Sequence, residues 1–357
     1  MNRKRTALAV AAAGTATGVV GLVLIASPAG ANEPPPALPP ISSEALVQSV
    51  LDSKVPALSG AVALQNNLGL PVPGLPQSSG KEAFARVYSD GTGRARLSLG
   101  QGTAGERTIV HDNGTTWFWN SADRSVVKYT GGAEHESVED KLADPATASR
   151  TFIEAIKQDS VVTVDGTARV ANRPVYQLVL TPKPTERTLL REVRVSVDEA
   201  TRLPLQVEVL ANGQSEPALK LGFTEFSTGA QDASLFSFTP PAGAKVTEPE
   251  VGDKPTEKQR DDLFAALDLK VVGEGWDTVL TGKIPAGALD QQIPQGQGRG
   301  GVDITSVLKQ LGKPVSGPFG TGYAISTNVG TALVTTDGRV AVGAVPQQVL
   351  VDALGQK

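Results

Sequence analysis

The stretch Arg191-Glu-Val-Arg-Val-Ser-Val197 alternates apolar and polar side chains, and Leu203-Pro-Leu-Gln-Val-Glu-Val209 repeats the alternation a few residues later. Successive side chains of a strand point to opposite faces, so both runs predict strands with one apolar face. The residues between them, 198–201, predict a turn that joins the two strands into a β-hairpin. The same period of two recurs along most of residues 60–238.

Three further hairpins follow from turn residues. Residues 107–111 and 115–119 flank Asn113-Gly114, a pair suited to a tight turn because both positions need a positive φ. Two more pairs are residues 82–88 with 94–99, around Asp90-Gly91, and residues 161–170 with 175–180; Asp165-Gly166 can interrupt the strand at 161–170. We therefore expect about ten antiparallel strands in this part of the chain.

The N-terminus predicts an export signal. Residues 3–5 are basic, residues 6–25 are uncharged, and the small residues Ala29 and Ala31 mark a signal-peptidase site, so residues 1–31 are expected to be removed. The alternative is a retained N-terminal membrane tether, because twenty residues are about enough to span a bilayer. Either way the sequence predicts an extracytoplasmic protein, secreted or associated with the cell envelope.

The rest of the chain divides by composition. Residues 32–41 contain five prolines and predict an extended spacer. Residues 42–247 form the strand-rich domain, residues 248–258 an acidic, proline-containing linker, and residues 259–357 a small α+β domain. In this last domain we expect helices at 261–267, 304–311 and 347–354, and strands near 278–280, 323–327, 332–336 and 339–345.

Composition excludes several kinds of chemistry. The chain has no Cys, two His and a net charge of -4, which excludes disulfides, thiol catalysis and a strongly basic nucleic-acid surface. Glu134-His135-Glu136 could hold a metal, but it is also typical of a solvated charged loop. No acid–base pair suits a hydrolase. We predict a protein that is not an enzyme and uses no metal or other cofactor.

The strand-rich domain offers an apolar face with few helices to cover it, since only residues 44–51 and 146–156 predict helices there. A sheet that curls around these helices would leave an aliphatic interior able to hold an acyl chain. The alternative is a fully packed sandwich or barrel. Strand parity assigns the lipid-binding cavity wall to Phe84, Leu97, Leu99, Trp117, Val193, Val195, Leu205 and Val207, and the helical stripes assign the plug to Leu46, Val50, Phe152, Ile153 and Ile156.

Four segments in order resemble a known family. His111-Asp-Asn-Gly-Thr-Thr-Trp-Phe-Trp-Asn120, residues 165–182, residues 195–204 and Phe236-Ser-Phe-Thr-Pro-Pro-Ala-Gly243 are similar to motifs of the periplasmic lipoprotein carriers of the LolA/LolB/RseB superfamily. The resemblance spans residues 42–247. It implies an α+β fold in which a curved, half-open antiparallel β-barrel is plugged by helices, and it implies binding of lipid or of lipoprotein acyl chains.

Two features depart from the simple carriers. The arginine that holds the lid of those carriers would correspond to Arg94 or Arg96, which could equally be outward-facing strand residues. The additional domain at 259–357 is similar to that of the two-domain RseB-like branch. That likeness implies a second function, an envelope sensor in sigma factor regulation whose partner is a membrane-bound regulator or transporter.

Overall fold

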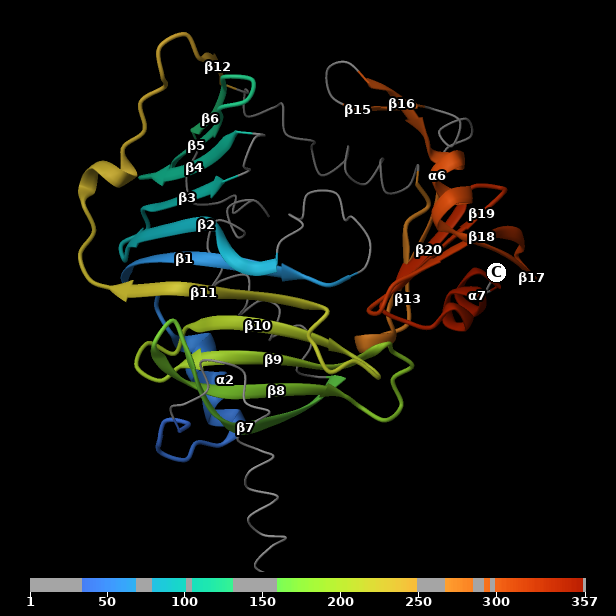
Figure 1. Cartoon of the computed structure of the whole chain (residues 1–357), viewed down its shortest axis with the longest axis horizontal. Coiled ribbons are helices and arrows are strands. Elements are labelled where there is room, and N and C mark those ends of the chain that lie inside the picture. The colour runs from blue at the N-terminus through green and yellow to red at the C-terminus, as the bar shows by residue number, and fades with distance from the viewer. Residues whose placement is uncertain are drawn as a thin grey trace, which may run out of the picture. The chain divides into compact units, whose positions relative to one another are not determined.

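The computed structural model describes residues 34–68, 79–100, 105–130, 159–248, 267–284, 292–295 and 299–355. The predicted signal peptide, the helices expected at 146–156 and at 261–267, the charged loop at 134–140 and nearly all of the linker lie outside the described residues. Leu38–Lys357 forms one compact unit. Its two large sheets are distinguished by colour in Figure 1.

The larger sheet has twelve strands in the order β12-β6-β5-β4-β3-β2-β1-β11-β10-β9-β8-β7. Every neighbouring pair is antiparallel except β12 and β6. The order begins at β12 and ends at β7, so the sheet is open and does not close into a barrel. The strands are β1 (Ala57–Asn66), β2 (Ser79–Asp90), β3 (Ala95–Gly100), β4 (Glu106–Asp112), β5 (Thr115–Asn120), β6 (Ser125–Thr130), β7 (Ser160–Val170), β8 (Arg173–Pro182), β9 (Leu190–Asp198), β10 (Pro204–Ala211), β11 (Leu219–Thr228) and β12 (Lys245–Thr247).

All four predicted hairpins are present, as β2–β3, β4–β5, β7–β8 and β9–β10. The β4–β5 turn has positive φ at Asn113 and Gly114, as the Asn-Gly pair requires. The interruption expected at Asp165-Gly166 is a register shift between Val164 and Thr167. The sequence did not single out β1 and β11, which lie side by side in the middle of the sheet.

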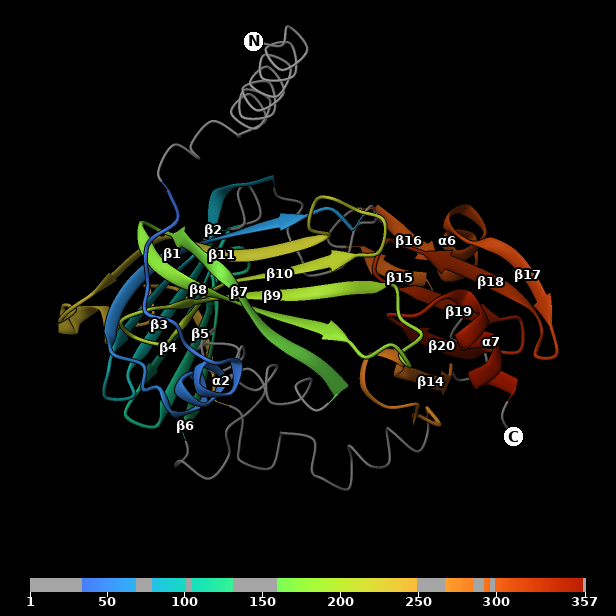
Figure 2. The same ribbon diagram turned by 90° about the horizontal axis from the view of Figure 1, so that it is seen from below.

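The helix expected near residues 44–51 is α2 (Ser43–Asp52). It begins after Ser42, whose hydroxyl accepts a hydrogen bond from the backbone N–H of Ala45 at 3.2 Å. Leu46, Val47 and Val50 form its buried stripe. Figure 2 shows the sheet bending so that α2 lies on its hollow side.

The C-terminal sheet has six antiparallel strands in the order β13-β14-β20-β19-β18-β17. The helix α7 (Gln347–Gly355) packs on one face of this sheet, and α6 (Ile304–Leu311) contacts β18. Both helices were expected, whereas β13 and β17 were not. The strands are β13 (Lys270–Val272), β14 (Val279–Lys283), β17 (Lys313–Gly317), β18 (Gly320–Ser326), β19 (Thr331–Thr335) and β20 (Arg339–Gly343), and a separate pair is β15 (Gln292–Gln295) with β16 (Arg299–Asp303).

No helix among the described residues is both long and apolar enough to cross a bilayer.

Candidate functional site

The face of the twelve-stranded sheet that carries α2, here called the inner face, contains two rows of apolar side chains. The pairing register aligns Leu178, Val195, Val207, Leu221 and Leu64 in one row across β8, β9, β10, β11 and β1. Directly paired residues of neighbouring strands point to the same side of a sheet. The row therefore runs without a polar side chain across five strands.

A second row continues the inner face across the other half of the sheet. It aligns Val87, Leu97, Ile109, Phe118 and Val127 across β2, β3, β4, β5 and β6. The two halves join at β1, where Val62 pairs with Ala85 of β2 and lies two residues from Leu64. Phe118 also contacts Tyr129 edge to face, with ring centroids 5.6 Å apart. The two apolar rows thus join at β1, while flanking positions of β4 and β5 on the same face carry the polar side chains Arg107, His111, Thr116 and Asn120.

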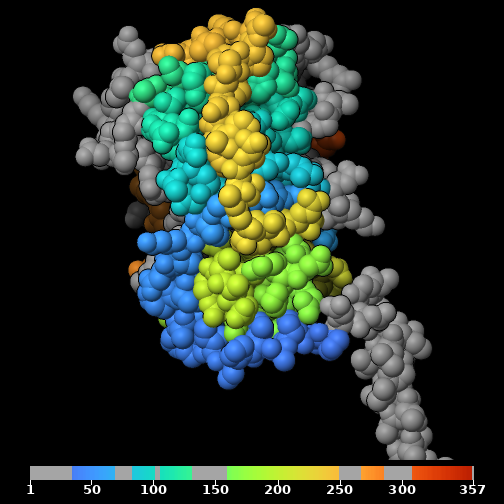
Figure 3. Space-filling model, turned by 90° about the vertical axis from the view of Figure 1, so that its left-hand side faces the viewer, coloured from blue at the N-terminus to red at the C-terminus, as the bar shows by residue number. Residues whose placement is uncertain are grey.

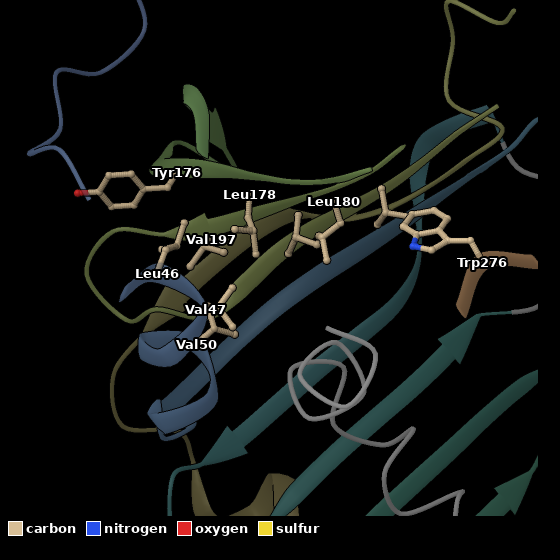
Figure 4. Packing of buried hydrophobic residues seen from close by; sticks show 10 residues of the cluster. Leu46, Val47, Val50, Tyr176, Leu178, Leu180, Val197 and Trp276 are labelled. Atoms are coloured by element: carbon tan, nitrogen blue, oxygen red, sulfur yellow. The ribbon is translucent and has the colours of Figure 1, made fainter. Parts of the chain in front are cut away.

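The helix α2 covers the inner face over β8 and β9 (Figure 4). Its stripe packs with Tyr176, Leu178, Leu180, Val193, Val195 and Val197 in one buried cluster. The Tyr176 hydroxyl donates a hydrogen bond to the carbonyl of Pro39 at 3.0 Å, so the end of the proline-rich segment is also fixed here. Each fully buried aliphatic side chain contributes about 1.5–3 kcal/mol to this packing.

The opposite end of the same cluster is covered by Trp276, which is only 7% exposed. Trp276 lies on the short 3₁₀ turn η4 (Gly275–Asp277), between β13 and β14. Its indole Nε1 donates a hydrogen bond to the hydroxyl of Ser160 on β7 at 2.8 Å. Figure 4 shows Tyr176 and Trp276 at the two ends of the row formed by Leu178 and Leu180.

Seven of the eight predicted wall residues lie in the two apolar clusters of the large sheet. Val193, Val195 and Val207 belong to the cluster under α2, and Leu97, Leu205, Phe84 and Leu99 belong to the second cluster, centred on β1, β2 and β3. The plug residues Leu46 and Val50 are fully buried against the first cluster. Phe152, Ile153 and Ile156 lie outside the described residues. That these residues bind lipid stays a prediction.

Trp117 is the eighth predicted wall residue, and it points away from the inner face. It pairs with Val110 and with Lys128, whereas its neighbour Phe118 occupies the inner row. Adjacent residues of a strand face opposite sides, so strand parity had placed Trp117 on the wrong side. The Trp117 ring lies 5.5 Å from the Phe238 ring.

Phe238 belongs to a segment of residues 230–244, here called the outer strap, that crosses the face opposite the inner face. Figure 3 shows the strap in yellow, running across the strands. Within it the 3₁₀ turn η3 (Ala233–Phe236) buries Phe236 completely. After the strap the chain enters β12 and pairs with β6.

Arg94 and Arg96 both hold the outer strap. The Arg94 guanidinium lies 5.2 Å from the centroid of the Phe236 ring, and Arg96 donates a hydrogen bond to the carbonyl of Leu235 at 3.4 Å. Arg96 pairs with Val110 and so shares the outer face with Trp117. Both arginines therefore face outward, which is the alternative that the sequence left open. Their contacts with the described residues do not include a helical lid that either arginine could hold shut.

Two aspartates beside the large sheet are held ionised. Burial opposes ionisation of Asp90, but hydrogen bonds from Thr92 and Arg94 outweigh it and lower the pKa of Asp90. Asp198 has no exposed side-chain surface, yet the hydrogen bonds of Arg173 and Thr201 likewise lower its pKa against the effect of burial. Both carboxylates accept hydrogen bonds from neighbouring residues of the same chain, so they suit structural roles.

The described residues contain no group of three or more His, Asp and Glu side chains placed to hold a metal ion. Sequence reasoning missed Trp276 and Phe236 as covers of the two faces. Phe236 belongs to one of the motifs named above, but Trp276 stands alone between Gly275 and Asp277, and no local pattern links it to the distant strands β7, β8 and β9.

Similar solved structures include the complex of MucA and MucB from Pseudomonas aeruginosa, with 16% identity, a TM-score of 0.42, and coverage of 87% of this chain and 94% of that chain. A LolA superfamily protein from Nitrosomonas europaea has 10% identity and a TM-score of 0.24, covering 56% and 99%. An outer membrane lipoprotein-sorting protein domain from Vibrio parahaemolyticus has 9% identity and a TM-score of 0.20, covering 54% and 95%.

No family model and no curated protein matches the chain. The solved structures that are similar to this chain include a protein whose name gives the superfamily that the sequence motifs resemble. Their names describe partner-binding and lipoprotein-sorting proteins.

Proposed function

We propose that the chain is an exported, non-enzymatic binding protein that shelters lipid, or the acyl chains of lipoproteins, on the inner face of its half-open sheet. The observation that supports this function most directly is the pair of apolar rows on the inner face. These two rows, one across β8, β9, β10, β11 and β1 and one across β2 to β6, contain only aliphatic and aromatic side chains. An acyl chain buried there would be stabilised by about 25 cal/mol per Å² of apolar surface.

The cover of this surface is small for its extent. Among the described residues, the ten-residue helix α2 and the turn that bears Trp276 join the cluster at β8 and β9. At the other half of the sheet Ile109, Phe118 and Val127 are half-buried. A surface of this kind suits a ligand that is long, flexible and uncharged over most of its length.

The test is binding of cis-parinaric acid, a fluorescent fatty acid, to the purified mature chain, together with native mass spectrometry for co-purified lipid. The inner-face variant Val127→Glu should weaken binding about tenfold or more, because an acyl chain cannot solvate a buried carboxylate. The matched control is Val246→Glu on β12, where the side chain is 45% exposed. If the wild-type chain binds no probe and carries no lipid, the proposed function is wrong.

A second candidate function is supported by a different surface. On the C-terminal sheet, Val271, Leu280 and Val342 form one paired row and are 69%, 41% and 42% exposed. Exposed apolar patches on soluble domains often mark protein interfaces. This row could bind the extracytoplasmic part of a membrane-bound anti-sigma regulator, which would make the chain an envelope sensor.

A pull-down from cross-linked cells distinguishes the two candidates. Recovery of a membrane regulator by the wild-type chain, and its loss with Leu280→Asp, would favour the sensor. Val161→Asp, on an exposed position of β7, is the matched control. Recovery of lipoproteins irrespective of Leu280→Asp would favour the carrier.

A further inference from the structure

We infer that Trp276 is a displaceable occupant of the inner face, so that binding of an acyl chain and docking of the C-terminal sheet against β7–β9 oppose each other. This inference rests on the proposed function and adds a regulation to it. Its first support is where the indole packs. Trp276 joins the apolar cluster of the large sheet and is absent from the core cluster of the C-terminal sheet that carries it.

The second support is the position of Trp276 within that cluster. The indole lies beyond Leu180 on the row that starts under α2 (Figure 4). Leu180 pairs with Val193, one of the predicted wall residues. An acyl chain that followed the row of Leu178 and Leu180 would therefore reach the place that the indole holds.

The third support is the polar nature of the other contacts around η4. Glu186 accepts hydrogen bonds through one oxygen from the backbone N–H groups of Trp276 and Asp277, at 2.9 and 3.2 Å. Further along, the carbonyl of Ala344 accepts from the hydroxyl of Thr188 at 2.7 Å and from the backbone N–H of Leu189 at 2.8 Å. Such hydrogen bonds can be exchanged for water at small net cost. Among the described residues, Trp276 is the only residue of the C-terminal part that joins the apolar cluster under α2.

The fourth support is a glycine that the docking requires. Gly275 has a φ of +62°, and a Cβ built there would lie 2.6 Å from the Cβ of Asp159. A side chain at this position must push the turn away from β7. The structure thus offers a way to loosen docking without altering the indole or the inner face.

Two ligands that compete for one place weaken each other by the same factor, whichever binds first. Here the first is the tethered indole and the second is the acyl chain. Loosening the turn should raise the affinity for an acyl chain, and saturating acyl chain should move Trp276 into water. The C-terminal sheet would then report whether the inner face is loaded.

The experiment measures the affinity of the full mature chain for cis-parinaric acid in Gly275→Ala. The matched control is Gly213→Ala, since Gly213 also has a positive φ but a Cβ there meets nothing within 4 Å. In case Gly275→Ala fails to fold, Glu186→Ala removes the acceptor of the two backbone N–H groups, with the exposed Glu216→Ala as its control. Trp276 emission is obtained by subtracting the spectrum of Trp276→Phe.

The expected result is an affinity about fivefold or more higher in Gly275→Ala and Glu186→Ala, with both controls unchanged, and a red shift of Trp276 emission as the wild-type chain fills with probe. Binding to the wild-type chain with equal affinity in all variants would overturn the inference while leaving the proposed function intact. Weaker binding in both loosened variants would also overturn it, because Trp276 would then be part of the wall. Absence of binding to every variant, wild type included, would reject the proposed function itself.

Discussion

The two faces of the twelve-stranded sheet are covered by different means. The outer strap lies across the outer face and is held by side chains of the strands beneath it, with Phe236 fully buried and the Arg94 guanidinium against its ring. The inner face is covered by apolar packing from α2 and Trp276, which come from parts of the chain far apart in sequence. The outer cover combines a buried ring with a cation–π contact and a hydrogen bond from the two arginines, whereas the inner cover is mainly apolar packing, to which Trp276 adds its hydrogen bond to Ser160.

This difference bears on function because apolar burial is not directional. A hydrophobic contact can be exchanged for another of similar area at little cost, whereas a bonded strap loses its specific partners when it moves. The inner face therefore suits exchange of a helix or an indole for a ligand. The outer face suits a role in holding the sheet together.

The largest effect is expected from Phe236→Ala in the outer strap. Loss of this fully buried ring should lower the free energy of unfolding by about 3–5 kcal/mol. Urea unfolding followed by fluorescence measures the loss, and the exposed neighbour Ser237→Ala is the control. The affinity for cis-parinaric acid should stay unchanged at concentrations where the variant is folded; a changed affinity would contradict a purely structural outer face.

A somewhat smaller loss of stability, about 3 kcal/mol, is expected from Leu46→Ala in α2. Here the affinity for cis-parinaric acid should change as well, and it should rise because α2 and the probe compete for the same surface. Gln48→Ala, on the exposed side of the same helix, is the control for helix content. Equal behaviour of Leu46→Ala and Phe236→Ala towards the probe would remove the distinction between the two faces.

The sequence predicted what depends on local pattern. The alternation at 191–197 and 203–209, the Asn113-Gly114 turn and the capped helix after Ser42 were all placed within a few residues, since each is decided by near neighbours in the chain. The alternation of side chains along the strands also selected seven residues that lie in the two apolar clusters, out of the eight predicted for the wall.

The failures concern contacts between distant segments. Trp117 was assigned to the wall because apolar content alone does not tell which face of a strand is covered by which segment. Trp117 lies on the outer face, where the ring of Phe238 from the outer strap packs near it. Trp276 was missed for the same reason, since its partners are Ser160 on β7 and Glu186 in the connection between β8 and β9.

The smallest loss in the free energy of unfolding, about 1–2 kcal/mol, is expected from Asp90→Asn at the β2–β3 turn. The Asp90 carboxylate pairs with Arg94 at 2.6 Å, and Arg94 in turn lies against Phe236, so the substitution loosens the outer cover alone. The pKa of Asp90 is lower in the folded chain than in the unfolded chain. The ionised carboxylate therefore adds to the free energy of unfolding at pH values above the ordinary carboxyl pKa of about 4, and this contribution declines as the pH falls below that value.

The difference in unfolding free energy between wild type and Asp90→Asn should therefore be full at neutral pH and shrink progressively in acid. Urea unfolding at neutral pH and at a series of pH values below 4 measures it. Asp112→Asn, in the β4–β5 turn, is the matched control and should change stability by no more than about 0.5 kcal/mol. A difference that is independent of pH would mean that the charge of Asp90 does not hold Arg94 against the strap, and the directional character assigned to the outer face would then rest on Arg96 and the strap backbone.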